Sequence, residues 1–241
     1  MTLPEPAADR TKRPHHPRDR GGRPVPADLS AGWQAALEEA WAAYGAGSYA
    51  IGACIVDARG QVLARGRNRL NEPRAAHGGV IGGHDLAHAE INALLNLPAT
   101  PRPDCYGWTV LTTVEPCPQC AGAVSMSGIR ALEYAAPDPW AGCARLLTDD
   151  AYVRRKGIRV VRAPQDVQRL ATVLALVSFM EEGHDTPDSA VLRAYAEVAP
   201  DDTRMALDVH QSGRLRSLRA AHAPLHEAVT ALAVPPGPVP V

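Results

Sequence analysis

The chain has 241 residues, of which 46% are hydrophobic, and its formal net charge at pH 7 is -1. This length suits one sizeable domain with extensions, and the hydrophobic content is sufficient to form a core. The near-zero net charge excludes a global electrostatic attraction to nucleic acid or to an anionic membrane, so any such contact has to be local.

Cysteine usage and the termini indicate the compartment. The five cysteines are odd in number, and two of them, Cys117 and Cys120, stand at metal-ligand spacing, which disfavours a disulfide framework. The N-terminal segment lacks the charged-then-apolar layout of a signal peptide, and the longest apolar stretch, residues 170–180, is about half the length that a bilayer requires. We therefore expect a soluble, cytoplasmic protein without a membrane partner.

Composition divides the chain into four regions. Residues 1–27 hold six prolines and almost no large apolar side chains, and residues 234–241 are similarly rich in proline, so we expect two disordered tails. Between the tails we expect a globular domain over residues 28–183 and a helical appendage over residues 184–233. The basic run at residues 12–18 is interpreted as a solvated arm in preference to a contact with a polyanion.

Hydrophobic periodicity and turn residues predict helices that alternate with short strands. A first helix, capped by Asp28 or Ser30, is followed by a strand hairpin, an irregular glycine-rich loop over residues 78–83, and a helix that begins at His88. The further strands are expected at residues 108–114, 131–136 and 158–161, with helices over residues 116–128 and 166–182. Three weaker helical segments, beginning near residues 186, 205 and 224, form the appendage. This alternation predicts an α/β sandwich with a mixed sheet.

Two short motifs concentrate reactive side chains: His88-Ala89-Glu90 and, further along the chain, Pro116-Cys117-Pro118-Gln119-Cys120. Histidine nitrogen and cysteine thiolate are preferred zinc ligands, and three such ligands leave the fourth tetrahedral position open, as catalytic zinc sites do. If the two cysteines lie in the first turn of a helix, its positive end favours their thiolate forms. We therefore expect His88, Cys117 and Cys120 to bind one Zn²⁺ per chain.

Glu90 is poorly placed to chelate the same ion, because residues two apart on a helix point in different directions. We interpret it as the group that moves protons to and from a reacting water. A redox role for the cysteine pair is the alternative, since a proline within such a motif is common in thiol oxidoreductases. The additional presence of His88 and Glu90 favours the metal site.

The two motifs, together with Gly66-Arg67-Asn68-Arg69, resemble those of the cytidine deaminase-like superfamily, nearest the tRNA adenosine, guanine and nucleoside deaminases. The resemblance covers residues 29–182. It implies a three-layer sandwich around a five-stranded mixed sheet, zinc held by the three ligands named above, Glu90 as the proton shuttle, and assembly as a homodimer. The helical appendage after residue 183 is not part of the resemblance.

The resemblance also implies substrate contacts. Asn68 aligns with an asparagine that hydrogen-bonds the base or sugar, and the main-chain N–H of Ala89 is expected to contact the base. An asparagine that simply ends a strand is the alternative for Asn68. Asp138 and Trp140 either line the pocket or belong to a rigid turn beside Pro137 and Pro139, and the sequence leaves both possibilities open.

Three functions are compatible with these motifs. The leading one is hydrolytic deamination of an amino-purine or amino-pyrimidine base, nucleoside or nucleotide, with release of ammonia. The alternatives are a tRNA adenosine deaminase and a non-catalytic, zinc-stabilised binding module. Near-neutral charge, the long loop over residues 70–86 and the appendage favour a small substrate over RNA, and Glu90 disfavours a purely structural zinc site. The sequence does not select the base.

Overall fold

A computed structural model of the chain describes residues 29–77, 80–98, 102–184, 186 and 188–233. The two tails that we expected to be disordered lie outside the described residues, as does Asp28. The first helix, α1 (Ala31–Gly45), begins after Ser30, whose Oγ accepts a hydrogen bond from the Trp33 main-chain N–H at 3.3 Å. Ser30 is thus the N-cap.

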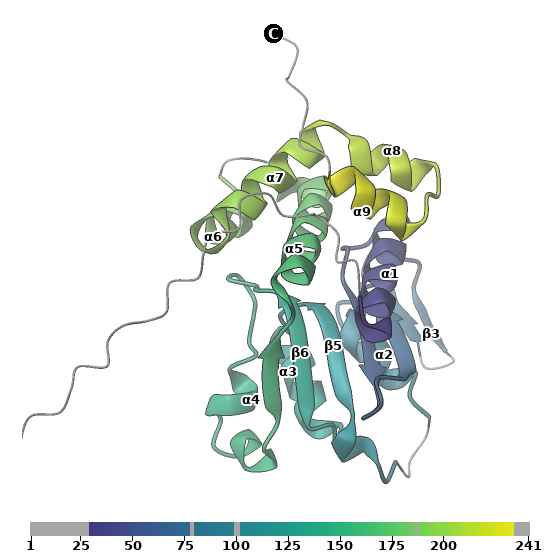
Figure 1. The fold of residues 1–241 in the computed structure, drawn as a ribbon, viewed down its shortest axis with the longest axis vertical. Coiled ribbons are helices and arrows are strands. Elements are labelled where there is room, and N and C mark those ends of the chain that lie inside the picture. Colours follow the sequence, from purple (N-terminus) through teal and green to yellow (C-terminus); the bar gives the residue numbers. More distant parts are fainter. Residues whose placement is uncertain (1–28, 78–79, 99–101, 185, 187, 234–241) are drawn as a thin grey trace, which may run out of the picture.

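A five-stranded sheet forms the centre of the molecule (Figure 1). Its strands are β1 (Gly52–Val56), β2 (Val62–Arg67), β5 (Thr109–Val114), β6 (Ala131–Ala136) and β7 (Arg159–Arg162). Their order is β2-β1-β5-β6-β7, with β1 antiparallel to both neighbours and β5, β6 and β7 parallel. The mixed sheet expected from the sequence is confirmed.

Helices cover both faces of this sheet. On one face, α1 and α5 (Gln165–Phe179) bury a core that includes Leu37 and Leu174. On the other face, α2 (Ala89–Leu95) and α3 (Pro118–Met126) contribute to a second core that contains Ile55, Val124 and Leu132. Three short helical turns lie between these elements: η1 (Cys105–Gly107), α4 (Leu146–Asp149) and η2 (Val153–Lys156). The three-layer sandwich is confirmed.

Two glycines allow helices to lie directly on the sheet. A Cβ at Gly52 would stand 2.1 Å from the Ala36 carbonyl oxygen of α1, and one at Gly66 would stand 2.2 Å from the Ala93 nitrogen of α2. Neither distance is physically possible, so a side chain at either position would push the helix away. Gly66 therefore determines how closely α2, which begins at Ala89, approaches β2.

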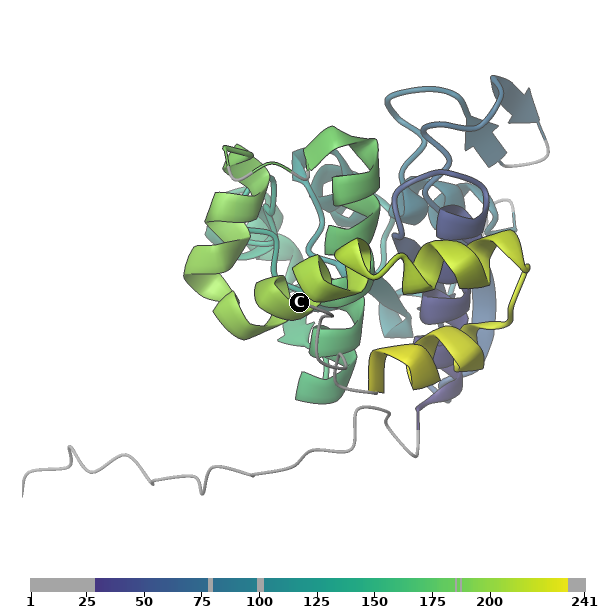
Figure 2. The ribbon, with the colours of Figure 1, turned by 90° about the horizontal axis from the view of Figure 1, so that it is seen from above.

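The glycine-rich segment before α2 differs from its predicted irregular loop. Two short strands, β3 (Ala75–His77) and β4 (Val80–Gly82), pair as an antiparallel hairpin that extends away from the rest of the chain (Figure 2). Asn92 of α2 secures it, since its Oδ1 accepts from Ile81 N at 2.8 Å and its Nδ2 donates to Ile81 O at 3.0 Å. The prediction for residues 80–82 was wrong because this pairing depends on a distant side chain and not on local hydrophobic period.

Four helices follow the π-turn η3 (Met180–His184): α6 (Ala190–Val198), α7 (Pro200–Gln211), α8 (Arg214–Ala220) and α9 (Leu225–Ala233). The first of them begins after Ser189, which caps it, and not near Thr186 as predicted. The second predicted segment is two helices, because Gly213 adopts φ +63° and breaks the chain direction between α7 and α8.

These helices pack above α1 and α5 (Figure 1) and do not form a separate core. Tyr195, Leu215 and Val229 are buried in the same cluster as Leu37 and Leu174. The helical appendage is therefore present and continuous with the main core, while its division from residues 28–183 as a domain stays a prediction.

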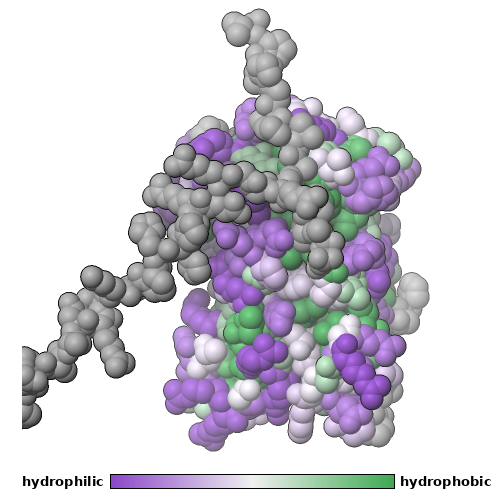
Figure 3. All heavy atoms as spheres, viewed as in Figure 1, coloured by the Kyte–Doolittle hydropathy of each residue, from purple (hydrophilic) through white to green (hydrophobic). Residues whose placement is uncertain are grey.

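The surface mixes polar and apolar residues. On the face drawn in Figure 3, hydrophilic residues surround smaller hydrophobic patches. Among the described residues, every helix is too short or too polar to cross a bilayer.

Candidate active site

The expected zinc ligands meet at one edge of the sheet, where the parallel strand β5 ends and where α2 and α3 begin. His88 is the N-cap of α2 and Cys117 the N-cap of α3, while Cys120 lies in the first turn of α3. His88 thus immediately precedes its helix, in extended conformation, and was expected just inside it. Pro118 starts α3 at a position where a missing N–H costs nothing.

The three ligand atoms have the spacing of a zinc site. His88 Nδ1 stands 3.5 Å from Cys117 Sγ and 3.5 Å from Cys120 Sγ, and all three atoms lie within 4.8 Å of one another. Tetrahedral Zn²⁺ with ordinary Zn–S and Zn–N lengths separates nitrogen and sulfur ligands by about 3.6 Å. The donor set therefore fits Zn²⁺, and within the described part of the chain it is the one group of histidines, cysteines and carboxylates that meets this spacing.

The two thiols share a proton unequally. A hydrogen bond with the Cys120 thiol, together with one from His88, lowers the pKa of Cys117 to about 4, although burial opposes the change. The same hydrogen bond and burial raise the pKa of Cys120 far above its usual range. In the metal-free pair, Cys117 is thus the thiolate and Cys120 retains the proton, which has to leave when a metal ion binds both sulfurs.

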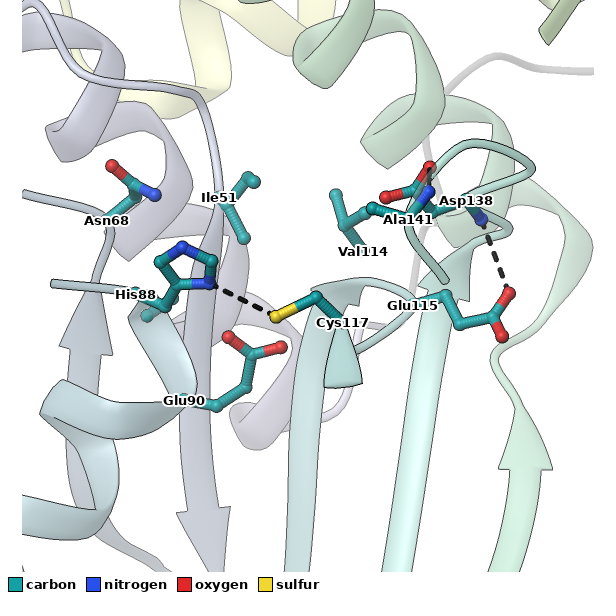
Figure 4. A pocket seen from close by; sticks show the side chains of 10 residues that line it. Ile51, Asn68, His88, Glu90, Val114, Glu115, Cys117, Asp138 and Ala141 are labelled. Carbon is teal, nitrogen blue, oxygen red and sulfur yellow. Dashed lines mark hydrogen bonds between the residues drawn. The ribbon is translucent and has the colours of Figure 1, made fainter. Parts of the chain in front are cut away.

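Glu90 is a buried carboxylate beside this ligand set. Its side chain is oriented by Thr112, whose hydroxyl donates to Glu90 Oε1 at 3.1 Å, and only 4% of the residue is exposed. Figure 4 shows the carboxylate between His88 and Cys117. Burial raises the pKa of Glu90 above its usual value, an effect that His88 partly offsets. A carboxyl group whose pKa moves toward neutrality is suited to both accepting and donating a proton.

A cavity of about 90 Å³ opens above these groups. It brings together five of the six residues that we expected at the site, and the sixth, Cys120, is fully buried and does not line it. Its lining residues are Ile51, Asn68, His88, Ala89, Glu90, Val114, Glu115, Cys117, Asp138 and Ala141. The sequence analysis missed Ile51, Val114 and Ala141, because nothing in their chemistry distinguishes them from core residues.

Asn68 stands on the His88 side of the cavity (Figure 4). It is 2% exposed, its main-chain N–H donates to Ile51 O at 2.9 Å, and its Oδ1 accepts from Leu70 N at 3.0 Å. Its Nδ2 has no acceptor among the described residues. The buried amide therefore offers hydrogen-bond donors to whatever occupies the cavity.

Asp138 stands on the opposite side and Trp140 does not line the cavity. Asp138 Oδ1 accepts from Trp140 N at 2.9 Å and from Ala141 N at 3.0 Å, so Asp138 both forms a tight turn and lines the pocket. Burial raises its pKa. Trp140 is 60% exposed. Glu115 holds this turn, accepting from Asp138 N at 3.3 Å and from Ala144 N at 3.1 Å.

The remaining cysteines are not members of the ligand set. All five cysteines are free thiols. Cys54 is buried in the core and donates to Gly32 O at 3.1 Å, and burial raises its pKa to about 12. Cys54 is thus a packing residue of the core.

Residues 27–136 match the family model of the cytidine and deoxycytidylate deaminase zinc-binding region. This segment is thus similar to the zinc-binding region of that family. The cytosine deaminase of Candida albicans is 33% identical over 106 residues, which cover 43% of this chain and 63% of the relative. The tRNA-specific adenosine deaminase of Bacillus subtilis is 36% identical over 116 residues, which cover 46% of this chain and 64% of the relative. The chain thus spans less than two thirds of the length of these deaminases.

A solved structure of a guanine deaminase from Nitrosomonas europaea is also similar to this chain. It is 24% identical, with a TM-score of 0.44, and the match covers 64% of this chain and 86% of that one. The family match ends at residue 136. It includes Asn68 and the four residues around the proposed zinc position, and excludes Asp138 and the C-terminal helices.

Proposed function

We propose that the protein is a zinc-dependent deaminase that hydrolyses the exocyclic amino group of an amino-purine or amino-pyrimidine and releases ammonia. The observation that carries the proposal is the buried Glu90 carboxylate, held by Thr112 beside the three ligand atoms at the base of a cavity. A zinc site with a purely structural role has no use for a carboxylate directed at its open position. The family match of residues 27–136 supports the same chemistry.

In this proposal, His88, Cys117 and Cys120 hold the metal ion through the geometry described above. Zn²⁺ bound there supplies an attacking water of lowered pKa at neutral pH. Glu90 accepts a proton from the attacking water and delivers it to the ring nitrogen of the base. It then carries the second proton of that water to the amine, which leaves as ammonia while the carbon–oxygen bond becomes a carbonyl. Burial keeps bulk water from this carboxylate, and the Thr112 hydroxyl keeps Glu90 Oε1 in place.

The substrate contacts are assigned to Asn68 and Ala89. Asn68 Nδ2 is free to donate to a ring nitrogen or carbonyl oxygen, and Asp138, across the cavity, offers an acceptor to a ring N–H or exocyclic amine. The main-chain N–H of Ala89, at the start of α2, is a further donor. Such a combination fits a heterocyclic base presented as free base, nucleoside or nucleotide.

Ammonia release tests the proposal. The zinc-loaded full chain is assayed against guanine, adenine, cytosine and their nucleosides, with Glu90→Gln as the matched variant. We expect one zinc per chain in both proteins, and a loss of activity on the order of a thousandfold in the variant, as for removal of a general acid-base group. A wild type that is silent across the panel, or a variant as active as the wild type, would contradict the proposal.

Deamination of adenosine in tRNA is the second candidate, since a relative from Bacillus subtilis carries that name. The net charge of -1 gives RNA no general attraction. Arg219 of the C-terminal helices is moreover paired with Glu181 at 3.1 Å and does not form a free cationic patch. Binding of a tRNA anticodon stem-loop that weakens steeply with added salt would favour this candidate.

We also propose a cytoplasmic location and a homodimer. The five free thiols suit a reducing compartment. Met126 and Tyr152 are 67% and 57% exposed, and both flank Lys156, whose Nζ lies 3.3 Å from Met126 Sδ and 4.8 Å from the Tyr152 ring centroid. An exposed apolar group of this kind suits a subunit interface. Light scattering coupled to size exclusion distinguishes a dimer from a monomer.

A further inference from the structure

The C-terminal helices reach the core through hydrogen bonds around Glu181. Tyr44 Oη on α1 donates to Glu181 Oε1 at 2.7 Å, and Arg219 Nη1 on α8 donates to Glu181 Oε2 at 3.1 Å. The guanidinium also lies 5.2 Å from the centroid of the Tyr44 ring. The Glu181 side chain is 11% exposed, so its charge requires these partners to stay in place.

Arg219 also lies against the segment that joins α1 to β1, residues 46–51. A Cβ built at Gly47 would stand 3.3 Å from Arg219 Nη2, and Gly47 has φ +80°, a conformation that other residues rarely adopt. The Gly47 carbonyl accepts from Asn71 Nδ2 at 3.1 Å, and Ser48 Oγ accepts from Asn71 N at 3.0 Å. The guanidinium therefore supports residues 46–51 from one side, and Asn71 holds them from another.

The same segment forms one wall of the cavity. Ile51 lines the cavity directly, and its carbonyl oxygen holds the Asn68 main-chain N–H at 2.9 Å. Asn68 and Asn71 both belong to the short stretch that follows β2. The hydrogen bonds from these two asparagines to residues 46–51 therefore hold the same wall of the cavity. Displacement of this segment would move the Asn68 amide relative to His88, and sub-ångström placement of binding groups governs how well they act.

We infer that Arg219 is a positioning residue for substrate binding: it fixes residues 46–51 through Glu181, Tyr44 and Gly47, and so fixes the wall formed by Ile51 and Asn68. The inference rests on the proposed deaminase function. The C-terminal helices thereby contribute to the substrate site, although every lining residue precedes residue 142.

The test compares zinc-loaded, full-length Arg219→Ala and Arg219→Lys with the wild type. In Arg219→Ala we expect amide hydrogen exchange in residues 46–52 to accelerate at least about tenfold, because local opening becomes easier. For the base that the wild type deaminates, we expect KM to rise about three- to tenfold with kcat within about twofold, the pattern of lost uniform binding. Arg219→Lys recovers part of both effects, since it keeps the charge but loses the fork geometry.

Arg204→Ala is the matched control, because its ion pair with Asp201 lies in the same helical region but is largely exposed. We expect neither exchange nor KM to change in it. The inference would be overturned if Arg219→Ala melted at a lower temperature while hydrogen exchange in residues 46–52 and KM stayed at the wild-type values. Arg219 would then act on stability alone. The hydrogen-exchange measurement does not depend on enzymatic activity, so it tests the inference even if no substrate is found. If no base is deaminated, the proposed function fails, and unchanged exchange would separately show that Arg219 does not fix the segment.

Discussion

The sheet edge that carries the ligands and the C-terminal helices α6–α9 are held by different kinds of contact. At the sheet edge, the ligands occupy two N-caps and one first turn, so the site depends on a few residues in two short motifs. The C-terminal helices depend on apolar side chains such as Leu215, spread along the chain, and on the Glu181 network. Substitutions at the sheet edge should therefore remove chemistry and keep the fold, whereas those in the helices should lower stability and keep the ligand set.

The largest effect is expected at the ligands. In Cys117→Ala, one of the three donors is lost, and we expect zinc content to fall to background and ammonia release to fall by at least about a thousandfold. Circular dichroism should still show the α/β fold, because Cys117 caps a helix at the edge of the core and does not fill it. If the fold were lost together with zinc, the metal site would instead be structural, and the contrast between the sheet edge and the C-terminal helices would not hold.

The second-largest effect is expected in thiol alkylation, where Cys117 and Cys54 should react at very different rates. The pKa of Cys117 is about 4 in the metal-free pair and that of Cys54 is about 12, so at pH 6 the first is a thiolate and the second a thiol. We expect iodoacetamide to modify Cys117 first in the apo-protein, at a rate that stays level from pH 8 to about pH 5 and falls as the pH drops through the pKa. Bound zinc should protect it. Equal modification of both residues, read by mass spectrometry, would contradict this.

Leu215→Ala probes the other region. Leu215 is 1% exposed in the core beneath α8, and we expect the free energy of unfolding to fall by about 2–5 kcal/mol, as for other buried leucines. Zinc stoichiometry should not change. Val198→Ala is the control, since Val198 is 55% exposed and its truncation should cost less than about 0.5 kcal/mol. Zinc loss in Leu215→Ala would mean that the two regions are not separable.

Asn68→Ala is expected to have the smallest effect of the four and lies where the two regions meet. Loss of one neutral hydrogen bond to the substrate should lower kcat/KM about tenfold while zinc content stays the same. Asn96→Ala is the matched control: its Nδ2 bonds Arg65 O at 2.8 Å on the surface, away from the cavity. An unchanged kcat/KM in Asn68→Ala would return Asn68 to the role of a residue that merely ends a strand.

The grouping of His88, Cys117 and Cys120 could be predicted because the chemistry of zinc ligands is local. Zinc accepts few donor types, and the spacing of Cys117 and Cys120 within one helical turn is itself the geometry that binds the metal. The order of strands and helices could likewise be predicted from the sequence, because hydrophobic residues recur differently in a buried strand such as residues 109–114 and in an amphipathic helix. These parts of the fold need no information from elsewhere in the chain.

The missed parts share a dependence on distant residues. The β3–β4 hairpin is held by Asn92, and the wall of the cavity is supported by Arg219, far along the chain from Gly47. Ile51, Val114 and Ala141 line the cavity as ordinary apolar residues, with no donor or acceptor to mark them. Only the packed chain shows which of several such residues face a ligand.

Gly66 has no chemical role at the site, yet a methyl group there would collide with the Ala89 carbonyl oxygen at 2.4 Å, one residue from His88. The absence of a side chain at this position therefore allows α2 to lie directly on β2 and so helps to set where His88, the N-cap of α2, stands relative to the other two ligands. A side chain at Gly66 would therefore shift the helix that follows His88, and with it the distances from His88 to Cys117 and Cys120, although Gly66 is not one of the three ligands.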